Sequence, residues 1–323
     1  MKKKLLITAG GTGSAWQIAE KVRLFYDDRI ELYITDTNPE ELVASSTLAD
    51  HFIMVPPVKS KGYADQMYRI LKSNCINAII PLIPWEQSYF AMDLKQFASM
   101  GIKSAAPLVR TARTLNQKIK LHDYCNSCDI PTIPIIAPED VKDNKTYFIK
   151  DKSGFGSMGA RRIKGADIKR LDRKYFDKYV IQQDCTGLGS RAGVLEEVTA
   201  ECFYDGFECH TIVRERLEAK SGVCTKARFR KEPQIEAVVN RFTELLPFPP
   251  VFNIQFVKRG DEWLVMDVNL RLAAGTGLSA AAGFDVVRAL LAWILDDMVD
   301  PGWLEYDESV KTVLRVYKEI TVR

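Results

Sequence analysis

Three polar side chains alternate along a stretch that begins as a predicted strand. Asp267, Asn269 and Arg271 lie at positions i, i+2 and i+4, directly after the apolar run Leu264–Met266. Successive side chains of a strand point to opposite faces, so this spacing predicts that the three share one face. A carboxylate and an amide oxygen suit Mg²⁺, and a guanidinium binds phosphoryl or carboxylate oxygens. The pattern indicates a polyphosphate site; a half-exposed strand with a solvated polar face is the alternative.

A second predicted strand, Val251–Lys258, precedes this one and is joined to it by the turn Arg259-Gly260-Asp261. If the register of this hairpin brings Gln255 beside Asp267, the amide oxygen of Gln255 becomes a third ligand. The predicted metal ligands are therefore Gln255, Asp267 and Asn269.

A glycine-rich loop lies between two further predicted strands, residues 146–150 and 160–163. Its Gly-x-Gly-x-x-Gly spacing precedes a strand, whereas a Rossmann site needs a helix there, and the Gly-Lys-Ser/Thr of a Walker loop is absent. A hairpin that covers phosphates fits better, because glycines let backbone N–H groups approach oxygens closely. A surface hairpin is the alternative. The predicted phosphate contacts are Lys150, Ser153, Gly154, Gly156, Ser157 and Gly159.

These motifs resemble a known family. Asn253-Ile254-Gln255, a short turn, Asp267-x-Asn269-x-Arg271 and the following Gly-Thr-Gly loop resemble the metal-binding hairpin of the ATP-grasp enzymes. Within that family the sequence is most similar to the branch that includes the large subunit of carbamoyl phosphate synthase. The usual text there is Glu-x-Asn-x-Arg, so the side chain of Asp267 is one methylene shorter than the family's glutamate.

The resemblance assigns further roles along the chain. It implies that Lys118 contacts nucleotide phosphates together with Lys150, and that residues 179–187 contact adenine mainly through the backbone. A glutamate that opens the following strand would accept hydrogen bonds from the ribose; we match it to Glu201, with Glu196 as the alternative. The implied cofactor-binding residues outside the glycine loop are Lys118, Lys150, Gln183, Asp184, Cys185 and Glu201.

The implied chemistry is ATP-dependent ligation. ATP phosphorylates a substrate carboxylate to an acyl phosphate, and an amine or similar nucleophile then displaces phosphate. Arg271, Lys150 and Arg216 are the implied catalytic residues, with Arg216 favoured over Lys220 and Lys226 for holding the substrate carboxylate or acyl phosphate. The cofactors would be ATP and Mg²⁺, with Mn²⁺ as a substitute, and a homodimer is a family-level expectation.

The order of elements predicts an α/β fold with two domains. Strands and helices alternate from the N-terminus, which predicts a Rossmann-like parallel sheet with helices on both faces over residues 1–107. The character of the sequence changes after Pro107. The resemblance implies a two-lobed α+β ATP-grasp domain over residues 108–323, with its lid at about 130–184.

Three other functional hypotheses remain beside the ligase. Gly11-x-Gly13 after the first strand and Asp36 after the second mimic a dinucleotide fingerprint, although Trp16 stands at the third glycine position, which predicts either an NAD-dependent enzyme or a purely structural turn. Glu86 follows a strand end in the same region and could contact substrate or serve as a helix cap. A carbamoyl-phosphate-synthase-like subunit acting with a partner, and a non-catalytic nucleotide-binding protein, also remain open.

Composition narrows the remaining classes. The net charge of +3 gives no electrostatic case for nucleic-acid binding. The apolar stretch Ala280–Met298 contains Asp285 and Arg288, so we expect a buried helix rather than a membrane span. Seven scattered cysteines indicate reduced thiols in a cytoplasmic protein. The family resemblance implies that its partners are small-molecule carboxylate and amine substrates.

Overall fold

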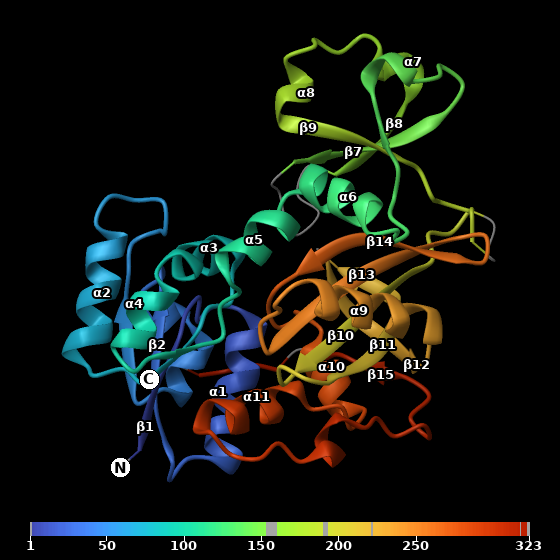
Figure 1. Ribbon diagram of the computed structural model, residues 1–323. Coiled ribbons are helices and arrows are strands. Elements are labelled where there is room, and N and C mark those ends of the chain that lie inside the picture. The colour runs from blue at the N-terminus through green and yellow to red at the C-terminus, as the bar shows by residue number, and fades with distance from the viewer. Residues whose placement is uncertain (1, 153–159, 190–192, 221, 317, 322–323) are drawn as a thin grey trace.

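The computed structural model describes residues 2–152, 160–189, 193–220, 222–316 and 318–321. The strands form three sheets, one in the N-terminal third, one in the middle of the chain and one in the C-terminal half (Figure 1). The middle sheet stands above the other two, which pack against each other through α1 and α11. The predicted α/β class with a Rossmann-like N-terminal part is confirmed.

The N-terminal sheet has five parallel strands in the order β3-β2-β1-β4-β5. Parallel neighbours need crossover connections, and helices provide most of them here. Because the chain moves to one side of β1 and then returns to the other, the carboxyl ends of β1 and β4 flank the topological switch point. The elements are β1 (Lys3–Ile7), α1 (Gly13–Phe25), β2 (Ile30–Asp36), β3 (His51–Met54), α2 (Tyr63–Ser73), β4 (Ala78–Ile80), α3 (Pro84–Met92), α4 (Leu94–Ser99) and β5 (Lys103–Ser104).

The middle sheet has four antiparallel strands in the order β6-β9-β7-β8. It has a small core of its own, built around Tyr147, Ile149 and Ile181. Helices α5 and α6 lead into it from the N-terminal sheet. The elements are α5 (Val109–Leu115), α6 (Lys118–Ser127), β6 (Ile135–Ile136), β7 (Thr146–Asp151), β8 (Arg161–Lys164), α7 (Gly165–Ile168), α8 (Tyr175–Lys178) and β9 (Tyr179–Gln183).

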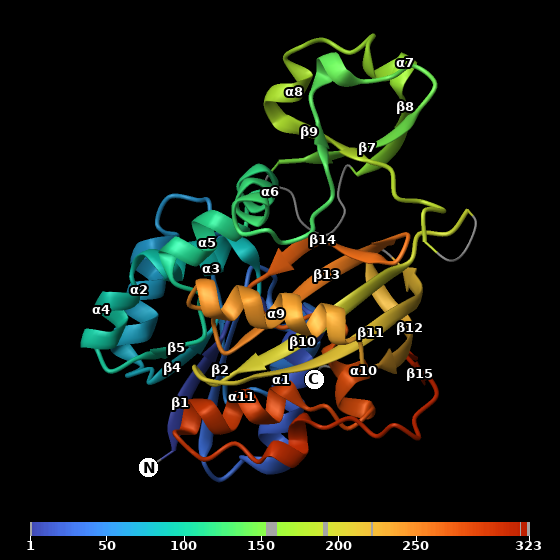
Figure 2. The ribbon, with the colours of Figure 1, turned by 45° about the vertical axis from the view of Figure 1, so that its right-hand side comes forward.

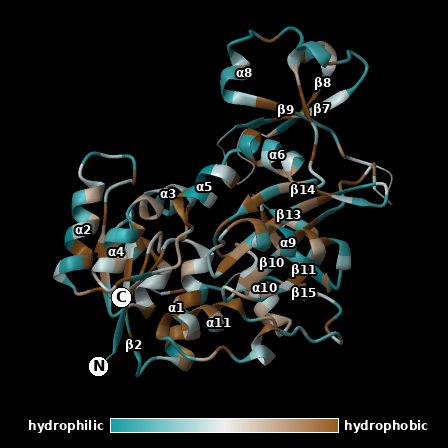
Figure 3. Cartoon of the chain, in the orientation of Figure 1, coloured by the Kyte–Doolittle hydropathy of each residue, from teal (hydrophilic) through white to brown (hydrophobic). Residues whose placement is uncertain are grey.

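The C-terminal sheet has six antiparallel strands in the order β14-β13-β10-β11-β12-β15. Helix α9 covers one face (Figure 2), where Val239 and Phe242 pack against Ile254 and Phe256. The apolar residues gather where strands and helices pack (Figure 3). The elements are β10 (Glu197–Tyr204), β11 (Cys209–Lys220), β12 (Val223–Arg230), α9 (Pro233–Leu245), β13 (Val251–Arg259), β14 (Glu262–Asn269), α10 (Thr276–Ala281), α11 (Val286–Leu295) and β15 (Val313–Leu314).

Three details differ from the sequence-based expectation. The sequence predicts one helix over about 87–100, whereas the structure has two helices, α3 and α4, that meet at Asp93. Strand β3 was not anticipated, because none of its four residues is buried and the apolar signal is therefore weak. The sequence predicts a final strand over residues 310–317, the last of which lies outside the described residues. The structure has the shorter strand β15 there, which pairs with β12 at two positions.

Short 3₁₀ helices complete the connections, at Glu40–Leu42, Ala44–Leu48, Pro138–Asp140 and Pro301–Leu304. Within the described ranges, no helix is both long enough and apolar enough to cross a membrane. The limits predicted for the two domains and the lid remain predictions.

Candidate functional site

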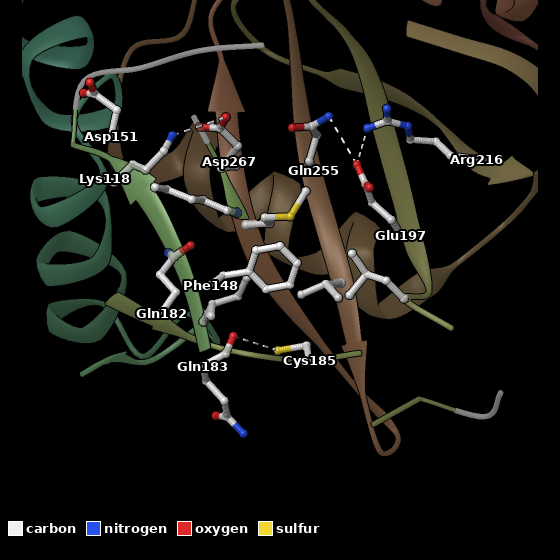
Figure 4. Close-up of a pocket in the computed structure, with 16 residues that line it drawn as sticks. Lys118, Phe148, Asp151, Gln182, Gln183, Cys185, Glu197, Arg216, Gln255 and Asp267 are labelled. Atoms are coloured by element: carbon white, nitrogen blue, oxygen red, sulfur yellow. Dashed lines mark hydrogen bonds and ion pairs between the residues drawn. The ribbon is translucent and has the colours of Figure 1, made fainter. Parts of the chain in front are cut away.

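A cavity of about 240 Å³ lies between the middle sheet and the C-terminal sheet. Figure 4 shows side chains from both sheets pointing into it, with Lys118 and Gln182 on one side and Gln255 and Glu197 on the other. Its lining residues are Lys118, Ile133, Phe148, Lys150, Asp151, Ala160, Gln182, Gln183, Cys185, Leu195, Glu197, Arg216, Gln255, Val257, Met266 and Asp267. We call this space the first pocket.

The polar side chains come from one face of the C-terminal sheet. Along β10, Val198, Ala200 and Cys202 pack into the core beneath α9, so the alternate residues point to the opposite face. The register there forms a row across four strands, because Asp267 pairs with Gln255, Gln255 with Thr199 and Thr199 with Arg214. The structure thus places Gln255 beside Asp267, as the hairpin register required.

A β-bulge lies beside Asp267. The register between β13 and β14 shifts between Gln255 and Phe256, so Gln255 pairs with Asp267 while Phe256 pairs with Val265. Val265 and Val268 both belong to the core beneath α9. The extra residue lets Met266 and Asp267 both line the first pocket, which supplies an apolar surface next to the carboxylate.

Two lysines approach Asp267 from the lid side. The Nζ of Lys118 lies 3.7 Å from the carboxylate of Asp267, and the backbone N–H of Lys118 donates to Lys152 at 3.0 Å. Lys150, on β7, also lines the pocket, and burial lowers its pKa against the opposing effect of Asp267. A polyphosphate entering this space would meet two ammonium groups, and its charge would offset the desolvation of Lys150.

The three predicted metal ligands fit Mg²⁺ in chemistry. Gln255 turns its Nε2 toward Glu197 at 3.4 Å, and Asn269 donates its Nδ2 to Asn253 at 3.3 Å. Both amides therefore keep a carbonyl oxygen for a cation, next to the Asp267 carboxylate. The described residues contain no group of three His, Cys, Asp or Glu side chains that could hold a metal. With one carboxylate among the three ligands, the protein alone would bind Mg²⁺ weakly, and nucleotide phosphates would have to complete the site.

The predicted hinge residues separate into two groups. Gln183 ends β9 and, with Cys185, lines the first pocket. Asp184 points elsewhere: its carboxylate accepts hydrogen bonds from Arg162 at 2.6 and 2.8 Å and from the backbone of Thr186. Burial opposes ionisation of Asp184, but these hydrogen bonds outweigh it and hold the pKa of the carboxyl below its ordinary value. Asp184 therefore fixes the hinge rather than facing the cavity.

The match of Glu201 to the ribose position is corrected by the structure. Glu201 is 1% exposed and does not line the first pocket. Its carboxylate accepts hydrogen bonds from Arg214, Thr276 and Ser279, which occupy both oxygens. The alternative, Glu196, lines a neighbouring pocket instead.

Glu197 opens β10 and faces the first pocket, where it accepts hydrogen bonds from Arg216 and Gln255. The sequence could have indicated Glu197, because the resemblance places the ribose contact on a glutamate that opens the strand and Glu197 is the first residue of β10.

A second pocket of about 100 Å³ adjoins the first, and Arg216, Gln255 and Asp267 line both. Arg271 also lines it; burial lowers the pKa of this guanidinium, and Asp267 opposes that effect. Arg214, which sequence analysis did not single out, forms a further part of the wall. The complete lining is Thr199, Arg214, Arg216, Gly222, Cys224, Asn253, Gln255, Asp267, Asn269, Arg271, Ala273, Ala274 and Gly275.

Five of the predicted phosphate-binding residues lie outside the described residues. They are Ser153, Gly154, Gly156, Ser157 and Gly159. The strands on either side, β7 and β8, pair as an antiparallel hairpin from Thr146 to Lys164, as the strand–loop–strand pattern predicted.

In the N-terminal glycine turn, the carboxylate of Asp36 is already hydrogen-bonded to neighbouring residues. Asp36 accepts a hydrogen bond from the Gly11 N–H at 2.7 Å and two from Asn38 at 2.8 Å. Glu86 is buried and accepts hydrogen bonds from the hydroxyls of Thr8 at 2.5 Å and Tyr63 at 3.0 Å. Burial raises the pKa of Glu86 to about 7. Neither carboxylate is left for a cofactor ribose, so the geometry argues against a dinucleotide site.

Family comparisons agree with this architecture. Residues 5–105 match the family described as PylC-like, N-terminal domain. Residues 195–318 match the family described as ATP-grasp in the biosynthetic pathway with Ter operon. This stretch of the chain is an ATP-grasp domain. The narrower resemblance to carbamoyl phosphate synthase remains a prediction, and no curated protein matches the sequence significantly.

Solved structures share the fold of this chain. The N5-carboxyaminoimidazole synthetase of Staphylococcus aureus, complexed with ADP, has a TM-score of 0.72 at 13% identity, covering 93% of this chain and 79% of that chain. The biotin carboxylase domain of the Hydrogenobacter thermophilus 2-oxoglutarate carboxylase, in complex with MgADP, ADP and bicarbonate, has a TM-score of 0.73 at 13% identity, covering 92% and 70%. N5-carboxyaminoimidazole ribonucleotide synthetase from Thermus thermophilus has a TM-score of 0.67 at 12% identity, covering 92% and 79%. At these identities the likeness establishes the fold alone.

Proposed function

We propose that this protein is an ATP-dependent ligase that activates a substrate carboxylate as an acyl phosphate and joins it to an amine or a similar nucleophile. The observation that carries the proposal is the junction of the two pockets. There Asp267 and Gln255 face both spaces, with lysines on the side of the first pocket and arginines on the side of the second. Similar structures described as complexed with ADP or MgADP support nucleotide binding in this fold.

The first pocket would hold ATP. Apolar side chains of Ile133, Phe148 and Met266 offer surfaces for a base, and Gln183 and Cys185 supply hinge backbone groups. Glu197 would accept hydrogen bonds from ribose hydroxyls in place of Glu201. Lys118 and Lys150 would neutralise the phosphates, because they are the ammonium groups beside Asp267.

Mg²⁺ would be held by Asp267, Gln255 and Asn269, and when bound it would neutralise charge on the phosphate oxygens. Side chains of the protein would orient the substrate and stabilise the charge that develops during the reaction. Arg216 and Arg271 would orient the carboxylate so that one oxygen attacks the terminal phosphorus of ATP while ADP departs. The guanidiniums would then stabilise the tetrahedral centre formed when the nucleophile attacks the acyl carbon and phosphate leaves.

The partners implied are small molecules, an acid and an amine. The Hydrogenobacter thermophilus domain is described as a dimer, and a homodimer of this chain remains a prediction, as does a cytoplasmic location.

The test is phosphate release from Mg·ATP against a panel of carboxylic acids and amines. Release that requires both an acid and an amine, and is lost in Lys150→Ala and Asp267→Ala, would establish a ligase. Lys95→Ala, an exposed lysine of α4, is the matched control and should leave release unchanged. Failure of the wild-type protein to bind ATP in a calorimetric titration would refute the proposal.

A further inference from the structure

Arg214 stands at the far end of the polar row that begins at Asp267. In the row Asp267, Gln255, Thr199, Arg214, each neighbour is one strand further across the sheet. Adjacent strands are about 4.8 Å apart, so the backbones of Asp267 and Arg214 are separated by roughly 14 Å. The backbone of Arg214 is therefore displaced from that of Asp267 across the sheet, yet Arg214 lines the same second pocket as Arg271.

The guanidinium of Arg214 is rigidly held. It is 2% exposed, and its Nη1 donates to Glu201 at 2.8 Å, to Ser279 at 2.7 Å and to the carbonyl of Gly275 at 3.0 Å. Gly275 permits this approach, because a Cβ there would collide with the guanidinium. Three acceptors on one nitrogen fix the plane and the direction of the fork, so little side-chain entropy remains to be lost on binding a ligand.

The other edge of this guanidinium is the one that binds carboxylates side-on. The three hydrogen bonds given above all leave from Nη1, and the buried Nε has no partner among the described residues. The edge formed by Nε and Nη2 matches the two oxygens of a carboxylate. A buried donor left unpaired costs free energy, and a carboxylate in the second pocket that accepts hydrogen bonds from this edge would relieve that cost.

We propose that the second pocket binds an acid with two carboxylates, one activated beside Asp267 and the other held by Arg214. The inference rests on the proposed ligase function and names its substrate class as a small dicarboxylic acid. Arg216 and Arg271 serve the reacting end, because Arg216 is shared with the first pocket and Arg271 follows Asn269 on the metal hairpin. Arg214 serves the distal end and sets specificity. The volume of about 100 Å³ limits the acid to a short chain.

The test compares dicarboxylates with monocarboxylates of equal chain length, using succinate, glutarate and adipate against butyrate, valerate and hexanoate. The variant is the double substitution Arg214→Gln with Glu201→Gln, since removing the arginine alone would leave a buried carboxylate unpaired. Arg214→Lys keeps the charge but loses the fork. Arg241→Gln, an exposed arginine of α9, is the control for loss of an arginine elsewhere.

In the wild-type protein, we expect at least one dicarboxylate to support phosphate release with a KM about tenfold or more below that of its monocarboxylate. The double variant should raise that KM about tenfold while kcat changes less than about threefold, and Arg214→Lys should restore it only in part. Equal KM values for both acids in the wild type, or a double variant with lower stability and an unchanged KM, would overturn the inference and leave Arg214 a structural ion pair.

A calorimetric titration separates this inference from the proposed function. The dicarboxylates are added to the wild-type protein and to the double variant, with and without a non-hydrolysable ATP analogue. Binding of the analogue together with no heat from any dicarboxylate would refute the inference and leave nucleotide binding intact. Dicarboxylate binding that the double variant weakens would support the inference even in the absence of phosphate release.

Discussion

Two regions of this chain pair an aspartate with a glycine-rich turn, and they differ in what the aspartate contacts. Asp36, at the end of β2, has both oxygens occupied by its own loop, through Gly11 and Asn38. Asp267, on β14, is one-quarter exposed and contacts the ammonium of Lys118 at 3.7 Å across a cavity. The first carboxylate stabilises a turn, and the second faces a space that a ligand can enter.

The comparison shows why residue type alone did not separate a structural site from a binding site. Both aspartates lie at or near the end of a strand, and a glycine turn was matched to each of them in the sequence. Only the hydrogen bonds distinguish them: a satisfied carboxylate has no capacity left for a ligand, whereas Asp267 sits beside two amide oxygens and two lysines. The predictions below test this distinction.

Asp267→Asn should have the largest effect. The substitution keeps the shape of the side chain but removes the only carboxylate among the three proposed metal ligands, so turnover should fall about a thousandfold, or about 4 kcal/mol in the barrier. The fold should tolerate the change, because Asp267 is partly exposed. The measurement is kcat for phosphate release alongside thermal unfolding. An active Asp267→Asn variant would contradict the assigned site.

Glu86 should make stability depend on pH. Its folded pKa of about 7 lies above the unfolded value near 4.5, so the folded state binds the extra proton. The contribution is fully present below about pH 4.5 and is lost as the pH rises through about 7, for a total of about 3 kcal/mol. Denaturant unfolding at pH 5 and pH 8 measures the loss. Glu86→Gln, which cannot titrate, should show a smaller difference, and an equal difference would contradict the assignment.

Asp36→Ala should lower stability by about 2 kcal/mol, because it leaves the N–H groups of Gly11 and Asn38 without their acceptor. Turnover per folded molecule should stay near the wild-type value. This is the reverse of the result expected for Asp267→Asn. Chemical denaturation gives the stability, and turnover is normalised to the folded fraction. A stable variant with impaired nucleotide binding would return the dinucleotide hypothesis to consideration.

Much of the fold followed from local patterns. The period-2 alternation around Asp267 predicted the polar face of β14, and the N-terminal alternation of strands and helices predicted the parallel sheet. Strand β3 was not predicted because its residues are not buried and so give no apolar pattern. The length of β15 was overestimated because the length of an edge strand is set by pairing with its neighbour, here at two positions of β12, rather than by its own sequence.

The site was harder to predict than the fold, because the local sequence does not determine which side chains meet across strands. Nothing near Arg214 indicates that it meets Gly275 and Ser279, more than 60 positions away. The β-bulge that turns Met266 toward the pocket is likewise a property of the pairing. The match of Glu201 to the ribose position went astray for the same reason: Glu197 and Glu201 lie on the same face of β10, and only their partners show that Glu201 is buried.

Glu197→Gln tests the choice between those two glutamates and should have the smallest effect. If Glu197 accepts hydrogen bonds from ribose hydroxyls, the wild-type protein should favour ATP over 2′-deoxy-ATP, and the variant should lose most of that preference, with a cost of about 1 kcal/mol in ATP affinity. Arg216→Gln is the matched control, because it also breaks the contact between Arg216 and Glu197 but leaves the carboxylate in place. Comparison of the KM values for the two nucleotides decides the question. Unchanged discrimination in Glu197→Gln would mean that the carboxylate serves only to hold Arg216 and Gln255 at the junction of the pockets.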